Sequence, residues 1–178
     1  MIIKPQDIVV LAKLLACHEN KSWSQNSIAM ELCLSPSQIN SAFKRLVEAG
    51  LMTRYHSPNK PQPIIQACEE FFTHGLKYIF PAKLGEIVRG IPTSYAAPSL
   101  NEHIISGNDP IPVWPYGEGN ERGVALKPLY PSVPESVMKH PDPLFYDLLT
   151  LIDAIRSGRA REKQIATQKI SELLKNYK

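Results

Sequence analysis

The sequence predicts an α+β fold that is mainly helical and divides into three consecutive parts. Three observations lead to this prediction. Residues 1–80 contain several short amphipathic stretches with clear helix boundaries. Ten of the 16 prolines lie between Pro92 and Pro143, where they exclude long helices and favour extended segments and turns. Residues 142–178 return to helical periodicity, so we expect a Pro-rich segment, residues 81–141, between two helical parts.

The best-defined element is a helix from Pro36 to Ala49. Ser35 supplies an N-cap, and Gln38, three residues later, completes a capping box around a proline at the first helical position. Gly50 follows the last turn, where a C-cap glycine is common. Apolar residues at three- and four-residue spacing form one stripe: Ile39, Ala42, Phe43, Leu46 and Val47. The opposite face carries Ser37, Gln38, Asn40, Ser41, Lys44 and Arg45.

Two helices precede this one. In "WSQNSIAMELCLSPSQ", Ser24 is a candidate cap for a helix with its own apolar stripe, and only Cys33 and Leu34 separate that helix from Ser35. Upstream, "PQDIVVLAKLLACHEN" predicts another amphipathic helix. The order is therefore helix, helix, tight turn and helix.

A short hairpin is expected after Gly50. Residues 51–55 and 63–66 are candidate strands around a Ser57-Pro58-Asn59 turn. Pro61 and Pro63 donate no backbone hydrogen bonds, so the second strand would be confined to a sheet edge. Helices followed by a hairpin in this order predict a winged helix-turn-helix.

A resemblance supports this interpretation. The segment "WSQNSIAMELCLSPSQINSAFKRLVEAGLM" has a Trp-Ser opening, an Ile-Ala pair in its first helix, Leu-Ser-Pro-Ser at the turn and a Leu-Val-Glu-Ala-Gly-Leu exit. In these features residues 5–66, about a third of the chain, resemble the winged helix-turn-helix of MarR-like bacterial transcriptional regulators. The resemblance implies a sequence-specific DNA-binding regulator whose partner is double-stranded DNA.

The polar face of the helix from Pro36 is the expected reading surface, because the major groove admits a helix of this kind. Asn40 and Gln38 are candidates for bidentate contact with adenine, and Lys44 and Arg45 for contact with guanine or phosphate. The full candidate DNA-binding set is Ser35, Ser37, Gln38, Asn40, Ser41, Lys44, Arg45, Arg54 and Lys60. Two alternatives remain: a face that only meets water, and a winged helix that serves as a protein-interaction or assembly module for a neighbouring effector protein.

Charge is spread unevenly along the chain, whose formal net charge is +3. Residues 1–80 carry eight basic and six acidic side chains, residues 81–155 five and nine, and residues 156–178 seven and two. An acidic middle between basic ends suits a protein that contacts nucleic acid through parts of its surface.

Downstream of the hairpin, "QACEEFFTHG" predicts a short helix ending at Gly75, and "LKYIF" predicts a strand closed by Pro81. In the Pro-rich segment, "IPVWPYGEGNERGVALKPL" predicts a hairpin with arms at residues 113–114 and 124–126. Its many aromatic and apolar residues favour ordered structure, with a disordered linker as the alternative.

The chain ends in two predicted helices with apolar stripes, over residues 144–155 and 166–177. Regulators of this kind usually pair two recognition helices, so we expect a homodimer and assign these stripes to its interface. Packing of the stripes inside one chain, against Trp114, Tyr116 and the Pro-rich segment, is the alternative. The basic junction of Arg156, Arg159, Arg161 and Lys163 between the helices is either solvated or a phosphate or partner contact.

No enzyme signature is found: "GEGNERG" lacks the dinucleotide-binding glycine spacing, and there is no P-loop, HExxH or Gly-x-Ser-x-Gly motif. We therefore expect no catalysis and no cofactor. Three cysteines without CxxC spacing favour reduced thiols and a cytoplasmic protein. No feature favours the one alternative metal site, a zinc site of Cys17, His18 and Cys68.

The apolar run "IVVLAKLLAC" resembles a short secretory segment, but Asp7 and Lys13 interrupt it. No stretch approaches the roughly 20 apolar residues of a membrane span, so no membrane partner is expected.

Overall fold

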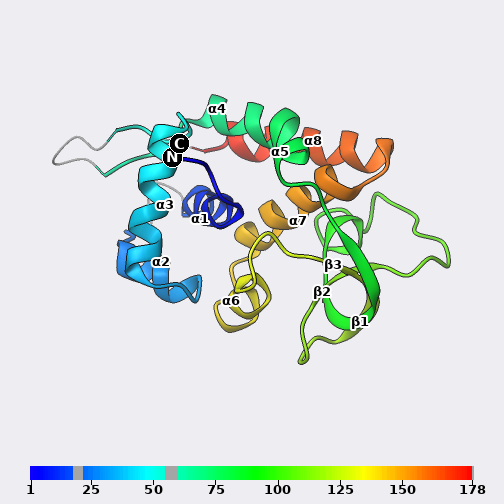
Figure 1. Cartoon of the computed structure of the whole chain (residues 1–178). Coiled ribbons are helices and arrows are strands. Elements are labelled where there is room, and N and C mark those ends of the chain that lie inside the picture. Colours follow the sequence, from blue (N-terminus) through cyan, green and yellow to red (C-terminus); the bar gives the residue numbers. More distant parts are fainter. Residues whose placement is uncertain (18–21, 55–59, 178) are drawn as a thin grey trace.

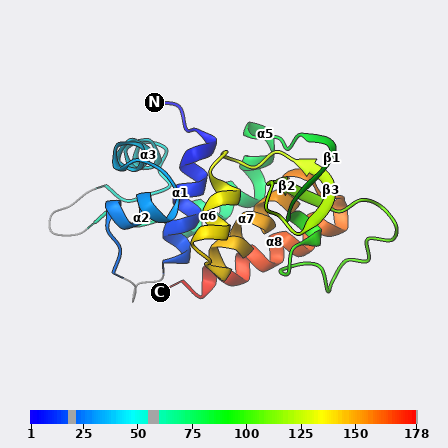
Figure 2. The same cartoon turned by 90° about the horizontal axis from the view of Figure 1, so that it is seen from below.

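The computed structural model describes residues 1–17, 22–54 and 60–177. In Figures 1 and 2, α2 and α3 lie at one end of the molecule and the strands at the other, with α1 and α7 between them. The helices are α1 (Pro5–Ala16), α2 (Gln25–Glu31), α3 (Pro36–Glu48), α4 (Ile65–Glu70), α5 (Leu76–Ile79), α6 (Val133–Lys139), α7 (Pro143–Ser157) and α8 (Ala160–Lys175). A π-helical turn, η1 (Phe71–Gly75), joins α4 to α5, and a 3-10 turn, η2 (Ser94–Ala96), follows the first strand. The strands are β1 (Leu84–Pro92), β2 (Pro112–Pro115) and β3 (Glu121–Leu126).

The predicted N-terminal helices are confirmed as α1, α2 and α3. The capping box of α3 forms as expected: Gln38 N–H donates to Ser35 Oγ at 3.3 Å, and Ser35 N–H donates to Gln38 Oε1 at 2.8 Å. In the turn between α2 and α3, Cys33 has a left-handed φ of 54°. This turn sets α3 against α2, and the two helices pack on each other.

α1 is the central helix of the molecule. Every side chain from Gln6 to Ala16 is buried, although the sequence predicted one apolar stripe. α1 packs against α3 and against α7, which explains burial around the whole helix. Asp7 and Lys13 are consequently removed from water, and a buried charge requires a charged or hydrogen-bonding partner.

In its described residues, the wing has less strand structure than predicted. Met52 and Pro63 form an isolated antiparallel bridge, so the two chain segments do meet. The predicted strand over residues 63–66 is wrong beyond that point, because α4 begins at Ile65. The predicted Ser57-Pro58-Asn59 turn lies outside the described residues.

The predicted helix end at Gly75 and the strand over residues 76–80 are also wrong, because the chain continues as helix to Ile79. Gly75 keeps a right-handed φ of −94°. A Cβ at Gly75 would lie 2.9 Å from a ring carbon of Phe71. The glycine therefore makes room for an aromatic ring inside a continuous helix and does not terminate one.

The strands form a small closed barrel in the order β1-β2-β3. Both predicted arms are strands, but the predicted hairpin between them is wrong. β2 and β3 are parallel to each other, and each pairs antiparallel with β1. The strand β1 itself was not predicted from the sequence. Gly90 pairs with Pro115 of β2 and with Glu121 of β3. A Cβ at Gly90 would lie 2.0 Å from Trp114 O, so only glycine permits this approach.

The Pro-rich segment also contains the helix α6, which the sequence analysis did not predict. Pro134 occupies its second position, where a missing N–H costs no helical hydrogen bond. The proposed division at residues 80 and 141 stays a prediction. Among the described residues, no helix combines the length and the apolarity needed to cross a bilayer.

The two C-terminal helices are confirmed as α7 and α8, and their apolar stripes are covered within the chain. The stripe of α7 is buried, and the Trp114 ring lies 5.8 Å from that of Tyr146 on α7. Asp153 of α7 accepts hydrogen bonds of 2.7 Å from Trp114 Nε1 and from Thr93 Oγ1, which attach the barrel to this helix. The stripes are therefore no longer a reason to place a dimer interface on α7 and α8.

Candidate nucleic-acid interface

α3 presents an exposed polar face on the side opposite its buried stripe. This face consists of Ser37, Asn40, Ser41, Lys44 and Glu48. The side chains of Asn40, Ser41 and Lys44 form no hydrogen bond or ion pair in the described part of the chain. They are thus available to a ligand without first breaking an internal contact.

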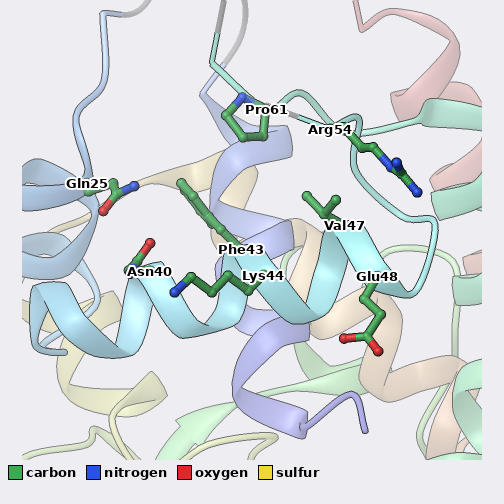
Figure 3. A pocket seen from close by; sticks show the side chains of 8 residues that line it. All are labelled: Gln25, Asn40, Phe43, Lys44, Val47, Glu48, Arg54 and Pro61. Atoms are coloured by element: carbon green, nitrogen blue, oxygen red, sulfur yellow. The ribbon is translucent and has the colours of Figure 1, made fainter. Parts of the chain in front are cut away.

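A groove of about 700 Å³ runs beside this face, between α3, the start of α2 and the wing (Figure 3). Its lining residues are Gln25, Asn40, Phe43, Lys44, Val47, Glu48, Arg54 and Pro61. In Figure 3, Asn40 and Lys44 lie along α3, with Gln25 and Pro61 across from them. Phe43 and Val47 give the groove an apolar floor, while its rim is polar and carries both signs of charge.

Two basic side chains of the wing differ in their availability. Arg54 is exposed and has no hydrogen-bond or ion-pair partner within the described residues. Lys60 lies over the Trp23 ring, with Nζ 4.6 Å from its centroid, and donates a hydrogen bond to Trp23 O. Arg54 is therefore free to meet a phosphate, whereas Lys60 must exchange existing contacts for one.

Arg45 does not lie on the exposed face. Its Nε and Nη2 donate to the two carboxylate oxygens of Asp7 on α1, at 2.7 Å and 2.6 Å. The hydrogen bond with Asp7 raises the pKa of Arg45 above its ordinary value. Arg45 is only 9% exposed and Asp7 is fully buried, so this pair joins α3 to α1 and keeps the guanidinium off the exposed face of α3. We therefore leave Arg45 out of the candidate interface.

Gln38 and Ser35 are occupied at the N-terminal end of α3. Besides its role in the capping box, Gln38 donates from Nε2 to the Tyr130 hydroxyl at 3.2 Å. Ser35 Oγ lies 2.9 Å from Ser37 Oγ as well as accepting the capping bond. The structure therefore brings together Ser37, Asn40, Ser41, Lys44 and Arg54 as an open surface, and it gives Ser35 and Gln38 roles in shaping the helix end.

Sequence reasoning missed Glu48. It lies one helical turn after Lys44 on the same face, and its Oε1 is 2.5 Å from the N-terminal amine of Met1. The four-residue spacing from Lys44 is a signal that would have found it. An acidic side chain on this face opposes phosphate binding, so Glu48 marks the end of α3 that is less suited to DNA.

A second ionic cluster supports α1 from its other side. Lys13 Nζ lies 2.5 Å from Glu31 on α2 and 2.8 Å from Asp142 at the start of α7. Burial lowers the pKa of Lys13, but the hydrogen bonds with Asp142 and Glu31 outweigh this effect and leave the pKa above its ordinary value. The ammonium group therefore holds three helices together in its charged form.

Within residues 1–17, 22–54 and 60–177 no group of three or more His, Cys, Asp or Glu side chains could hold a metal ion. Cys17 and Cys68 of the alternative zinc site are buried, and His18 lies outside the described residues. Cys68 Sγ donates to Leu51 O at 3.4 Å, and burial raises the pKa of its thiol to about 12.

Comparison with known proteins bears on the same region. A model of the MarR family matches residues 7–59, which contain α1, α2, α3 and the first part of the wing. No curated protein and no solved structure matches the chain. Members of the MarR family are regulators, and the match suggests a DNA-binding transcription regulator. The N-terminal part of this chain is thus a MarR-like winged-helix domain.

Proposed function

We propose that this protein is a sequence-specific DNA-binding transcriptional regulator that inserts α3 into the major groove of double-stranded DNA. One observation carries the proposal: within a MarR-like winged-helix domain, Asn40, Ser41 and Lys44 of α3 and the nearby Arg54 are exposed. None of the four side chains has a hydrogen-bond or ion-pair partner among the described residues. Side chains that need no internal contact broken bind a ligand at a lower free-energy cost.

The residues have separate roles in this proposal. Asn40 pairs with an adenine edge, Ser37 and Ser41 make smaller polar contacts, and Lys44 reaches guanine or a phosphate. Arg54 and Lys60 hold phosphates that border the groove. The protein requires no cofactor, and we place it in the cytoplasm, where DNA and reduced thiols occur together.

The regulator is further proposed to act as a homodimer, since one recognition helix covers too few base pairs to select a single genomic site. The buried face of α7 is not available for this contact. We therefore expect the interface on another surface. Light scattering of the full chain, with and without a palindromic duplex, tests the oligomeric state, and a 1:1 complex on a palindrome would contradict it.

The decisive experiment selects bound sequences from a random duplex pool with the full chain. It then measures affinity by fluorescence anisotropy over a range of salt concentrations. Lys44→Ala should weaken binding to all DNA and lower the salt slope by about 1 for each bound protomer, because each protomer loses one phosphate contact. Asn40→Ala should instead change sequence preference. Lys83→Ala removes the same charge in the link between α5 and β1, outside the candidate interface, and serves as the matched control. Unchanged affinity in an Asn40→Ala, Lys44→Ala double variant would refute the proposal.

The apolar floor of the groove favours a second candidate function. Phe43, Val47 and Pro61 would suit an apolar side chain of a partner protein, as in an assembly module. If the random pool yields no enriched sequence, this function becomes the better explanation.

A further inference from the structure

The helix α6 packs against the helix-turn-helix although it lies far outside residues 7–59. Ser136 Oγ donates to Glu31 O, the last residue of α2, at 2.6 Å. Tyr130, just before α6, accepts the 3.2 Å hydrogen bond from Gln38 Nε2. Figure 2 shows α6 beside α2 on the side of the molecule seen from below. Tyr130 therefore contacts the N-terminal end of α3, whereas the groove beside the wing runs along the middle and the C-terminal part of this helix.

The outer side of α6 carries charge next to the turn between α2 and α3. Lys139 is 60% exposed and pairs with Glu135 one helical turn earlier. Burial raises the pKa of the Cys33 thiol in that turn, with Glu135 raising it further and Lys139 lowering it. Both charged side chains of α6 are thus close enough to the turn to act on it electrostatically.

The position of this turn relative to DNA follows from the docking geometry of helix-turn-helix proteins. The N-terminal residues of the recognition helix contact base edges, and the preceding helix crosses the sugar-phosphate backbone. A phosphate strand therefore passes the turn between the two helices. A cation at the turn is well placed to meet it.

We infer that the DNA-binding surface continues from the winged helix onto α6, where Lys139 contacts a phosphate beside the turn and Tyr130 holds Gln38 at the N-terminal end of α3. Tyr130 is in this view a positioning residue, because its hydroxyl acts through Gln38 on the N-terminal end of α3. The inference rests on the proposed function and adds a contact from a part of the chain that the MarR family match does not include.

Glu135 competes with a DNA phosphate for Lys139. In the free protein it accepts the ion pair of Lys139, and the hydrogen bond from Lys139 to Glu135 raises the pKa of Lys139. A phosphate has to replace the carboxylate as the partner of Lys139. Removing the two charges one at a time should therefore move DNA affinity in opposite directions.

The test uses the full chain and two duplexes, one selected by the wild type and one of scrambled sequence. Lys139→Ala should weaken both complexes several-fold and lower the salt slope by about 1 for each bound protomer. Glu135→Gln should strengthen both complexes at low salt. Lys83→Ala, in the link between α5 and β1 and outside both the winged helix and α6, should change neither. Lys139 and Glu135 are solvent-accessible, so both variants should keep the thermal midpoint of the wild type.

Tyr130→Phe tests the positioning role, because it removes one hydroxyl and keeps the ring. The ratio of the affinity for the selected duplex to the affinity for the scrambled duplex should fall towards one. The salt slope should stay that of the wild type. Gln38→Ala should produce the same loss of discrimination, and Tyr130→Phe should add nothing to it.

Failure of the inference is distinguishable from failure of the proposed function. The inference is wrong if Lys44→Ala weakens binding while Lys139→Ala binds like the Lys83→Ala control and Tyr130→Phe keeps the sequence discrimination of the wild type. The winged helix would then bind DNA without α6. If the wild type itself binds neither duplex, both are wrong.

Discussion

Replacing Arg45 by methionine should destabilise the protein strongly and should affect DNA binding only through folding. The substitution leaves the Asp7 carboxylate, which is fully buried, without its two donors at 2.6 Å and 2.7 Å. Removing one partner of a buried ion pair costs about 3–5 kcal/mol. In a chain of this length each kcal/mol lowers the thermal midpoint by roughly 2–4 °C, so a decrease of about 6–20 °C is expected.

Urea unfolding followed by circular dichroism measures this cost as a double-variant cycle. Asp7→Asn keeps an oxygen for the hydrogen bond that Lys4 N–H donates to Asp7 at 2.8 Å, and it removes the charge. The double variant should therefore be more stable than Arg45→Met alone. Lys44→Met, one residue earlier on the exposed face, should change stability by no more than about 0.5 kcal/mol. An Arg45→Met variant with wild-type stability and no DNA binding would show that Arg45 contacts DNA after all.

Three further predictions concern single groups. Glu48→Gln should tighten DNA binding at low salt, because it removes a negative charge from the exposed face of α3; an anisotropy titration that shows weaker binding would contradict this. Cys33, which is partly exposed, should react with a thiol reagent in the native protein before Cys68, whose pKa is raised to about 12; mass spectrometry of the modified peptides gives the order. The pKa of Lys13 is raised in the folded state, so its ion pairs should stabilise the protein from neutral pH up to about pH 10.5 and be lost as the pH rises through the folded value; as the pH is raised from neutrality, the difference in urea midpoint between wild type and Lys13→Met should begin to shrink above pH 10.5.

Elements defined by nearby residues could be predicted from the sequence. The boundaries of α2 and α3 follow from serine caps that act within three residues, and both caps form as expected. The open part of the candidate interface was likewise predictable, since Asn40, Ser41 and Lys44 follow from helical periodicity alone.

Features that depend on distant partners could not be predicted in this way. Arg45 lies at the border of the polar face, and only the buried Asp7, 38 residues earlier, decides that it turns inward. The helix end predicted at Gly75 is wrong because this glycine makes room for the Phe71 ring in a π-helical turn. A pattern of helical periodicity does not reveal such a contact. β1 escaped prediction because it pairs with two strands through Gly90 and shows no regular alternation of exposed and buried residues.

The burial of α1 on all sides has a consequence for how this protein can be divided and controlled. The same helix packs against α3 on one side and against α7 on the other, so the winged helix and the C-terminal helices depend on one shared core for their stability. A winged helix cut out after residue 80 would lose the α7 that covers α1, and grafting it onto another protein would transfer an incomplete core. Conversely, any ligand that binds and stabilises the C-terminal helices also raises the population of correctly folded winged helix by mass action, without contacting the winged helix itself.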